Sequence, residues 1–192
     1  MLYTILKFLI RIICKLFFFV KIENGDRIPQ EGASILAVSH VSFWDPVVLL
    51  SCTKRPMRTM AKKELFRNKL LAVVLKMAGA FPVDRGTGDI TAIKTALKAL
   101  KDGKLFTIFP AGTRVKGDEA ADAKAGVALI ASRSGVPVIP IAMRGGYRLF
   151  HRVTIAVGNP MTMESTEGKK PTGDELKAFA DRIMQQIESL GA

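Results

Sequence analysis

A chain of 192 residues is long enough for one domain with a sizeable core, and 48% hydrophobic with 24% charged residues is an ordinary globular composition. The excess of 29 Lys and Arg over 17 Asp and Glu gives a net charge of +12, which favours a polyanionic partner such as an anionic membrane, an acidic protein or nucleic acid. No nucleic-acid-binding motif is present, so nucleic acid is not an expected partner, whereas the mean hydropathy of +0.22 indicates apolar surface meant for lipid.

The first twenty residues predict an amphipathic helix. Lys7, Arg11 and Lys15 recur every four residues, which places them on one side of a helix, while Leu, Ile and Phe cover the other sides. Each cation would cost about 2.5 to 3.5 kcal/mol near a bilayer centre, which disfavours a spanning helix. We expect residues 1–22 to lie in the membrane interface, with the cations toward anionic headgroups. A spanning helix and a helix buried on the domain are the alternatives.

Residues 23–192 predict strands and helices in alternation. Short apolar runs predict strands at 33–38, 81–83, 105–109, 136–143 and 153–157. Apolar periodicity and capping residues predict helices that start at Asp45-Pro46 or cover 64–78, 89–101, 124–133 and 172–190, and Pro110 to Arg114 predict a turn. This order indicates a single α/β domain, with a central mostly parallel or mixed sheet flanked by helices.

His40 ends the first of these strands, and Asp45 begins the helix that follows. Residues five apart on one helix point about 140° away from each other, but a strand–turn–helix layout lets them meet. A carboxylate beside a histidine fixes its tautomer and stabilises its charged form, an arrangement suited to proton transfer near neutral pH. The alternative is that Asp45 only caps the helix and His40 is incidental.

Four segments at the ends of expected strands stand where α/β folds tend to place their sites. Their residues are His40 and Asp45; Gly79, Phe81 and Arg85; Phe109, Pro110, Gly112, Thr113 and Arg114; and Val136, Pro137 and Pro140. In this order and spacing they resemble the four sequence blocks of the glycerolipid acyltransferase family, whose best-known members are 1-acyl-glycerol-3-phosphate acyltransferases. The chain departs from the family at Ala111, where the third block has Glu, and at Ser39, where the family often has Asn.

The resemblance implies transfer of a fatty acyl group from an acyl thioester, either acyl-CoA or acyl carrier protein, to the sn-2 hydroxyl of 1-acyl-glycerol-3-phosphate. The product would be phosphatidic acid, in phospholipid biosynthesis. His40 would be the base and Asp45 the residue that orients it. Substrate binding would fall to Arg85, Gly112, Thr113, Arg114 and Pro140, with the arginines suited to a phosphate group. No cofactor or metal is implied beyond the thioester co-substrate.

The same resemblance sets the expected partners and location. The partners are membrane lipids, lysophosphatidic acid and, where it is the donor, acyl carrier protein, and the location is the cytoplasmic face of the cell membrane as a peripheral or monotopic enzyme. Two alternatives stay open. Ala111 leaves room for another lyso-lipid acceptor, and a lipid-binding protein without catalysis is the alternative from another class. Cys14 and Cys52 offer neither a disulfide framework nor a metal-ligand spacing.

Overall fold

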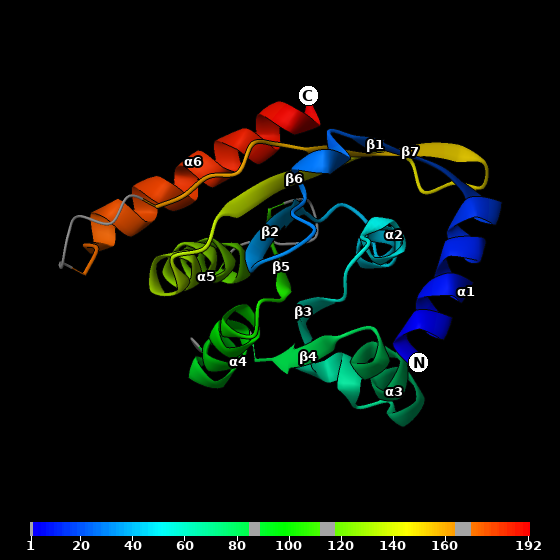
Figure 1. Cartoon of the computed structure of the whole chain (residues 1–192), viewed down its shortest axis with the longest axis horizontal. Coiled ribbons are helices and arrows are strands. Elements are labelled where there is room, and N and C mark those ends of the chain that lie inside the picture. Colours follow the sequence, from blue (N-terminus) through cyan, green and yellow to red (C-terminus); the bar gives the residue numbers. More distant parts are fainter. Residues whose placement is uncertain (1, 85–88, 112–117, 164–169) are drawn as a thin grey trace.

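The computed structural model describes residues 2–84, 89–111, 118–163 and 170–192, and shows a seven-stranded sheet with helices on both faces (Figure 1). The helices are α1 (Leu2–Phe17), α2 (Asp45–Cys52), α3 (Lys69–Met77), α4 (Ile90–Lys101), α5 (Asp118–Ser134) and α6 (Gly173–Gly191), with 3-10 turns at Gly25–Arg27 and Lys63–Phe66. The strands are β1 (Phe18–Glu23), β2 (Ser34–Ser39), β3 (Met57–Lys62), β4 (Ala80–Val83), β5 (Leu105–Ala111), β6 (Val138–Gly145) and β7 (His151–Val157).

The strand order in the sheet is β1-β7-β6-β2-β5-β3-β4. Neighbouring strands are parallel except for β6 and β7, which are antiparallel. The expectation of a single α/β domain with a mixed sheet between helices is therefore confirmed. Because β2 lies in the middle of the sheet and is buried along its whole length, the loop that follows it starts from fixed backbone.

Alternate side chains of β2 face different helices, as the two-residue period of a strand requires. Ile35 and Ala37 belong to a core shared with α4, α5 and α6, whereas Leu36 and Val38 belong to a core shared with α1 and α2. The sheet is thus the middle of three layers, with α1 and α2 on one face and α4, α5 and α6 on the other (Figure 1).

Several helix starts follow the capping residues in the sequence. Asp89 accepts a hydrogen bond from Ala92 N at 3.0 Å and caps α4, and Thr172 with Glu175 forms the expected capping box of α6. The segment 64–78 is not one helix, because Asn68 caps a new helix after a 3-10 turn.

Other boundaries differ from the sequence-based expectation. The predicted helix over residues 1–20 ends at Phe17, and the chain continues directly into β1, a strand that pairs with β7 and straddles the expected domain boundary at residue 22. The strand β3 has no counterpart among the expected strands. The expected turn at Pro110 is still part of β5, since Ala111 pairs with Ser39 of β2.

Part of the basic side of α1 packs on the domain, whereas the sequence led us to expect all three cations toward lipid headgroups. Lys7 is buried, with 8% of its surface exposed, and Arg11 Nε donates a hydrogen bond to the carbonyl of Ser51 in α2 at 2.7 Å. Burial, followed by the positive charge of Arg11, lowers the pKa of Lys7. Lys7 and Arg11 lie in one helical row with the buried residues Cys14 and Phe18, and this row packs on the domain. Arg11 keeps exposed surface beside its bond to Ser51, and Lys15 is exposed.

The outward side of α1 is apolar. Its exposed large side chains are Ile5, Phe8, Leu9, Ile12, Ile13, Leu16 and Phe17. Within the described ranges no helix combines the length and the apolar character needed to cross a bilayer.

Candidate active site

The connection between β2 and α2 holds His40 and Asp45 at the carboxyl end of the central strand. β2 ends at Ser39, whose hydroxyl accepts a hydrogen bond from Met143 N of β6 at 2.8 Å. This bond ties the two strands together one residue before His40. The loop that carries the histidine is therefore anchored on the sheet.

The side chain of Asp45 is fully buried and turns back toward this loop. Its Oδ2 accepts hydrogen bonds from His40 Nδ1 at 2.9 Å and from the backbone N–H groups of Val41 and Ser42, both at 2.7 Å. Because an ionised carboxylate can only accept, the proton of the imidazole lies on Nδ1, and Nε2 has a free lone pair. The strand–turn–helix layout thus brings the two side chains together as predicted.

The expected helix cap is wrong in one respect. Trp44, not Asp45, is the N-cap of α2, and no side chain caps the helix end. Asp45 is instead the first residue of the helix and Pro46 the second. The carboxylate serves the loop that precedes it and the histidine, so helix capping does not account for its burial.

The imidazole of His40 packs against Phe109 of β5, with ring centroids 4.7 Å apart and an angle of 39° between the planes. The side chain of His40 keeps 15% of its surface exposed. The ring is therefore held against an aromatic side chain, and part of the imidazole stays accessible from outside. A base held in this way can take a proton from a hydroxyl group.

Sequence reasoning missed one residue of this site. The hydroxyl of Tyr147, in the connection between β6 and β7, donates a hydrogen bond to Asp45 Oδ1. Tyr147 stands 102 positions from Asp45 in the chain, and no local spacing links them. Only the pairing of β6 beside β2 brings this tyrosine to the carboxylate.

A family model described as Acyltransferase matches residues 19–144. The chain belongs to this acyltransferase family. It is 34% identical over 178 residues to the 1-acyl-sn-glycerol-3-phosphate acyltransferase of Bacillus subtilis, covering 89% of this chain and 87% of that protein. It is also 34% identical to the protein of the same name from Streptococcus pneumoniae, covering 88% of this chain and 64% of that longer protein.

The fold agrees with the crystal structure of the 1-acyl-sn-glycerophosphate acyltransferase PlsC from Thermotoga maritima. That structure superposes with a TM-score of 0.70 at 20% sequence identity, covering 98% of this chain and 79% of the other. At this level of identity the likeness concerns the fold.

The structure places only one of the other expected binding residues, Pro140. Arg85, Gly112, Thr113 and Arg114 lie outside the described residues. The backbone that leads to Gly112 is described, and it ends at Ala111 beside Ser39, next to the histidine. Pro140 is buried inside the sheet opposite Ala37, and its carbonyl accepts a hydrogen bond from Gly158 N at 2.8 Å, so the structure places it within the sheet.

Gly79 and Phe81, which match the second family block, have structural roles in the acyltransferase. Gly79 has a φ of +87°, and a Cβ there would lie 2.2 Å from the carbonyl oxygen of Met57. Phe81 is buried and stacks on Phe106 with centroids 6.3 Å apart. Among the described residues no group of three or more His, Cys, Asp or Glu side chains could hold a metal ion.

Proposed function

We propose that this acyltransferase transfers a fatty acyl group from an acyl thioester to the sn-2 hydroxyl of 1-acyl-glycerol-3-phosphate, which gives phosphatidic acid. The observation that carries the proposal is the His40–Asp45 pair, a buried carboxylate on Nδ1 of a histidine that keeps a small exposed surface. The names of the relatives from Bacillus subtilis and Streptococcus pneumoniae supply the acceptor.

The chemistry follows from this pair. Nε2 of His40 takes the proton of the acceptor hydroxyl as its oxygen attacks the thioester carbonyl, and Asp45 stabilises the imidazolium that forms. The tetrahedral intermediate then collapses, the carbon–sulfur bond breaks, and the imidazolium returns the proton to the leaving thiolate. The hydroxyl attacks the thioester directly, so the protein carries no acyl group and needs no cofactor.

The phosphate of the acceptor requires cationic donors close to the dyad. Arg85 and Arg114, with Gly112 and Thr113 between β5 and α5, are our proposed phosphate site, because arginine binds phosphate oxygens bidentately. The pairing of Ala111 with Ser39 supports this, because the described part of β5 ends beside the residue that precedes His40.

We further propose that the enzyme binds the cytoplasmic face of the cell membrane as a peripheral or monotopic protein, through a lipid-binding surface. This surface comprises the outward side of α1 with Leu70, Val73 and Val74 of α3, Phe43 and Trp44 beside the dyad, and Leu149 and Phe150 beyond β6. α1 contacts α3, and Phe17 O accepts a hydrogen bond from Phe150 N at 2.8 Å, so these pieces adjoin along α1. The C-terminal end of α1 lies beside the loop of Asp45, because Phe18, which follows the helix, contacts Trp44. This arrangement would bring a membrane-borne acceptor to the base.

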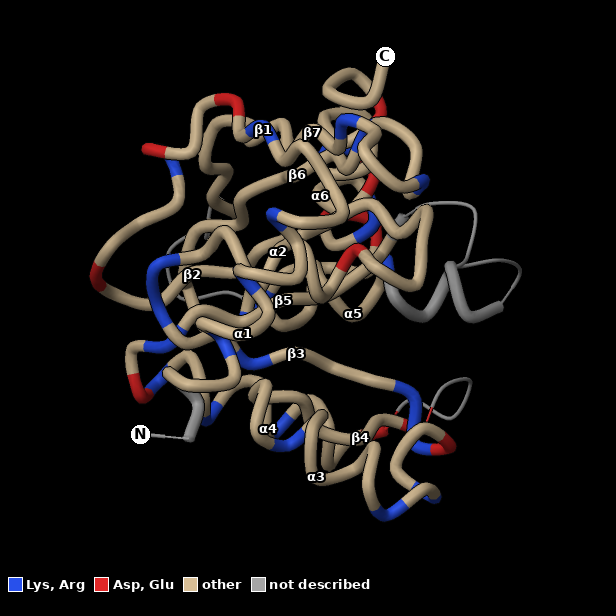
Figure 2. The backbone as a smooth tube through the Cα atoms, turned by 90° about the vertical axis from the view of Figure 1, so that its right-hand side faces the viewer, with Lys and Arg blue, Asp and Glu red and all other residues tan. Residues whose placement is uncertain are grey.

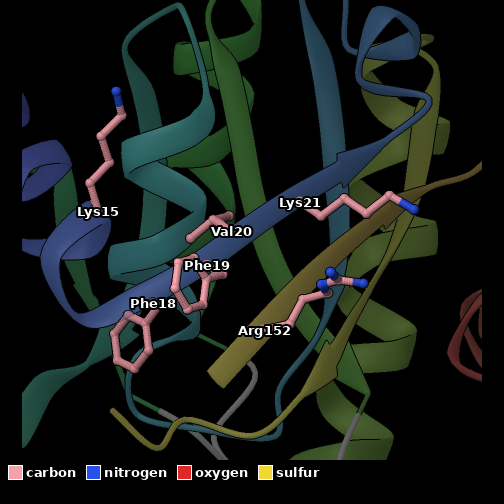
Figure 3. A pocket seen from close by; sticks show the side chains of 6 residues that line it. All are labelled: Lys15, Phe18, Phe19, Val20, Lys21 and Arg152. Atoms are coloured by element: carbon pink, nitrogen blue, oxygen red, sulfur yellow. The ribbon is translucent and has the colours of Figure 1, made fainter. Parts of the chain in front are cut away.

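Charge supports an anionic membrane as the partner of this surface. α1 contains no acidic residue, and Figure 2, which views the molecule from the side of α1, draws the helix only in tan and blue. Next to its end, a pocket of about 540 Å³ is lined by Lys15, Lys21 and Arg152 together with the apolar residues Phe18 to Val20 (Figure 3). Cations beside an apolar wall suit an anionic lipid headgroup. The same basic character suits either donor, the phosphates of coenzyme A or the acidic acyl carrier protein.

The test is an acyl-transfer assay of His40→Ala with acyl-CoA and acyl carrier protein as donors. Because the variant lacks the base, we expect the turnover number to fall by about 10³-fold, in the range typical of a general base. His151→Ala is the matched control, since His151 is the only other histidine and is exposed at the start of β7. Retained turnover in a folded His40→Ala protein refutes the proposed base.

A second acceptor remains a specific candidate because of Ala111. A family carboxylate is missing at a position that pairs with Ser39 beside the dyad, so the acceptor pocket differs there. The same assay should therefore include a panel of lysophospholipids. Faster transfer to one of these than to 1-acyl-glycerol-3-phosphate would favour the second acceptor, and no product with any acceptor would favour a non-catalytic lipid-binding protein.

A further inference from the structure

Tyr147 contacts the active-site carboxylate although the residues around it in the sequence give no sign of this contact. It lies in the connection that leaves β6 after Gly145, whose φ of +101° brings the turn so close to β7 that a Cβ would lie 2.2 Å from Arg152 O. This turn directs the half-buried tyrosine back over the edge of the sheet. Its hydroxyl ends at Asp45 Oδ1.

The two oxygens of Asp45 have separate partners. Oδ2 accepts from His40 Nδ1 and from two backbone N–H groups of the loop, whereas Oδ1 accepts from the hydroxyl of Tyr147. The carboxylate is therefore held from both sides, by its own loop and by the β6–β7 connection. A carboxylate held at both oxygens keeps a fixed plane, and its plane sets the direction in which the imidazole ring points.

The phenol of Tyr147 stays a donor in this arrangement. Burial, followed by the hydrogen bond and the negative charge of Asp45, raises the pKa of Tyr147 well above its ordinary value. Cys14 of α1 and Cys52 of α2 are the other titratable groups that act on it, and their charge when ionised would raise its pKa further. The hydroxyl therefore carries its proton over the whole range in which an enzyme of this kind works.

An aromatic contact fixes the ring of Tyr147 from the other side. Phe18 is buried at the point where α1 runs into β1 (Figure 3). It makes edge-to-face contacts with Tyr147 at 5.6 Å and with Trp44 at 5.7 Å between ring centroids. One phenylalanine thus touches both the residue that precedes Asp45 and the residue that donates to it. Edge-to-face pairs of this kind are directional contacts that restrict ring rotation.

From this geometry we propose that Tyr147 is a positioning residue for the His40–Asp45 pair, held in place by Phe18 at the end of the lipid-binding helix. The proposal rests on the proposed function, in which His40 is the base. In this role Tyr147 acts through Asp45 and not on the substrate. It fixes the carboxylate that fixes the imidazole, so its loss disturbs the alignment of Nε2 and leaves substrate binding unchanged.

The test is Tyr147→Phe, which removes only the hydroxyl and keeps the ring on Phe18. We expect the turnover number to fall by about 10-fold to 100-fold, the usual effect of one hydrogen bond to a charged group, with little change in KM. The acidic limb of the pH profile of kcat/KM should move to higher pH, because a carboxylate that has lost a donor stabilises the imidazolium more strongly. Thr95→Val, which removes an exposed hydroxyl from α4, is the matched control and should change neither value.

An NMR titration of the His40 ring keeps the test independent of turnover. The His151→Gln background leaves a single histidine signal in the full-length chain, and Tyr147→Phe should raise the pH at which that signal changes. If the wild-type enzyme transfers no acyl group, the proposed function fails while this titration still decides the role of Tyr147. An unmoved pH profile and an unmoved titration overturn the proposal, even if activity falls through loss of folded protein.

Discussion

Asp45 is the residue on which the site depends most, because its carboxylate has no contact with water and only donors around it. His40, two backbone N–H groups and the hydroxyl of Tyr147 all point at its two oxygens. A group in this position has to accept at every contact. An ionised carboxylate satisfies all of these donors at once.

Asp45→Asn should therefore remove activity while it leaves the shape of the site almost unchanged. The amide has one accepting oxygen and one donating NH₂. Because every partner around Asp45 is a donor, the NH₂ would point at another donor and could not form a hydrogen bond with it. We expect turnover to fall by about 10³-fold to 10⁴-fold, since the imidazole loses its fixed tautomer, and stability to fall by about 1 to 3 kcal/mol. Steady-state kinetics and urea unfolding measure the two effects.

The control for this change is Asp102→Asn at the end of α4. Asp102 is a partly exposed carboxylate that pairs with Lys98 at 3.4 Å, so its charge is shared with solvent. We expect no loss of turnover and little change in stability. An Asp45→Asn enzyme with wild-type turnover would contradict the role of the carboxylate.

At the scale of single residues, the sequence reveals partners that are close in the chain and misses those that are distant. His40 and Asp45 are five residues apart, so a strand end and a helix start are enough to predict that they meet. Tyr147 reaches the same carboxylate through the pairing of β6 with β2, and nothing in the residues around it signals this. Lone aromatic residues in loops carry no pattern that points to a buried partner.

Among the elements, β4 shows how a close backbone contact can fix the place of a strand in the sheet. Its strand lies at the edge of the sheet beside β3, and it leads to Arg85. Gly79, just before β4, fits against Met57 O only because it has no side chain. The match of Gly79 to the family's second block has this steric reason.

Gly79→Ala should destabilise the protein more than the same change at another glycine with positive φ. At Gly103, with φ +71°, an added Cβ would have no neighbour within 4 Å, so Gly103→Ala should cost only the left-handed backbone penalty of about 1 to 2 kcal/mol. At Gly79 the contact with Met57 O adds to that penalty, and we expect a loss larger by about 2 kcal/mol. Urea unfolding of both variants measures the difference, and equal losses would contradict the steric argument.

Elements with an obvious start or period were predictable, and those without one were not. The capping residues Asp89 and Thr172 mark the starts of α4 and α6. β1 escaped notice because its apolar residues continue the apolar run of α1 without a turn residue between them. β3 has Arg58 between the buried Met57 and Thr59 and ends at Lys62, and these two cations weaken the apolar signal of a strand.

On the scale of the whole molecule, the packing of α1 decides which of its sides faces outward. The amphipathic pattern of residues 1–20 is plain in the sequence, which led us to expect the cations toward headgroups and the apolar residues toward the acyl region. In the structure Lys7 and Arg11 lie on the side that packs on the domain, and the large apolar residues of the other side are exposed. The sequence of a helix indicates that it has two sides, while the choice between them depends on the partner against which it packs.

Substitutions on this exposed row test the lipid-binding surface without damage to the fold. Phe8 and Leu16 are 63% and 61% exposed on α1, so replacing both by Asp removes apolar area from the surface and adds charge. Burial of one such side chain contributes about 1.5 to 3 kcal/mol, so the double variant should bind anionic vesicles at least about 100-fold more weakly. Substitution is preferable to deletion of residues 1–20, because Phe18 to Val20 pair with β7 in the sheet.

The matched control is Ile90→Asp, an exposed apolar residue (65%) on α4, which lies across the sheet from α1 (Figure 1). If general hydrophobicity drove vesicle binding, the control would lose affinity as well. If the surface along α1 drives it, only the Phe8 and Leu16 variant is released from the vesicles in a flotation assay. Because the proposed acceptor is a membrane lipid, that variant should lose transfer to acceptor in vesicles but keep transfer to acceptor dispersed in detergent, where the dyad of His40 and Asp45 is unchanged. Equal vesicle binding by both variants would contradict the proposed surface.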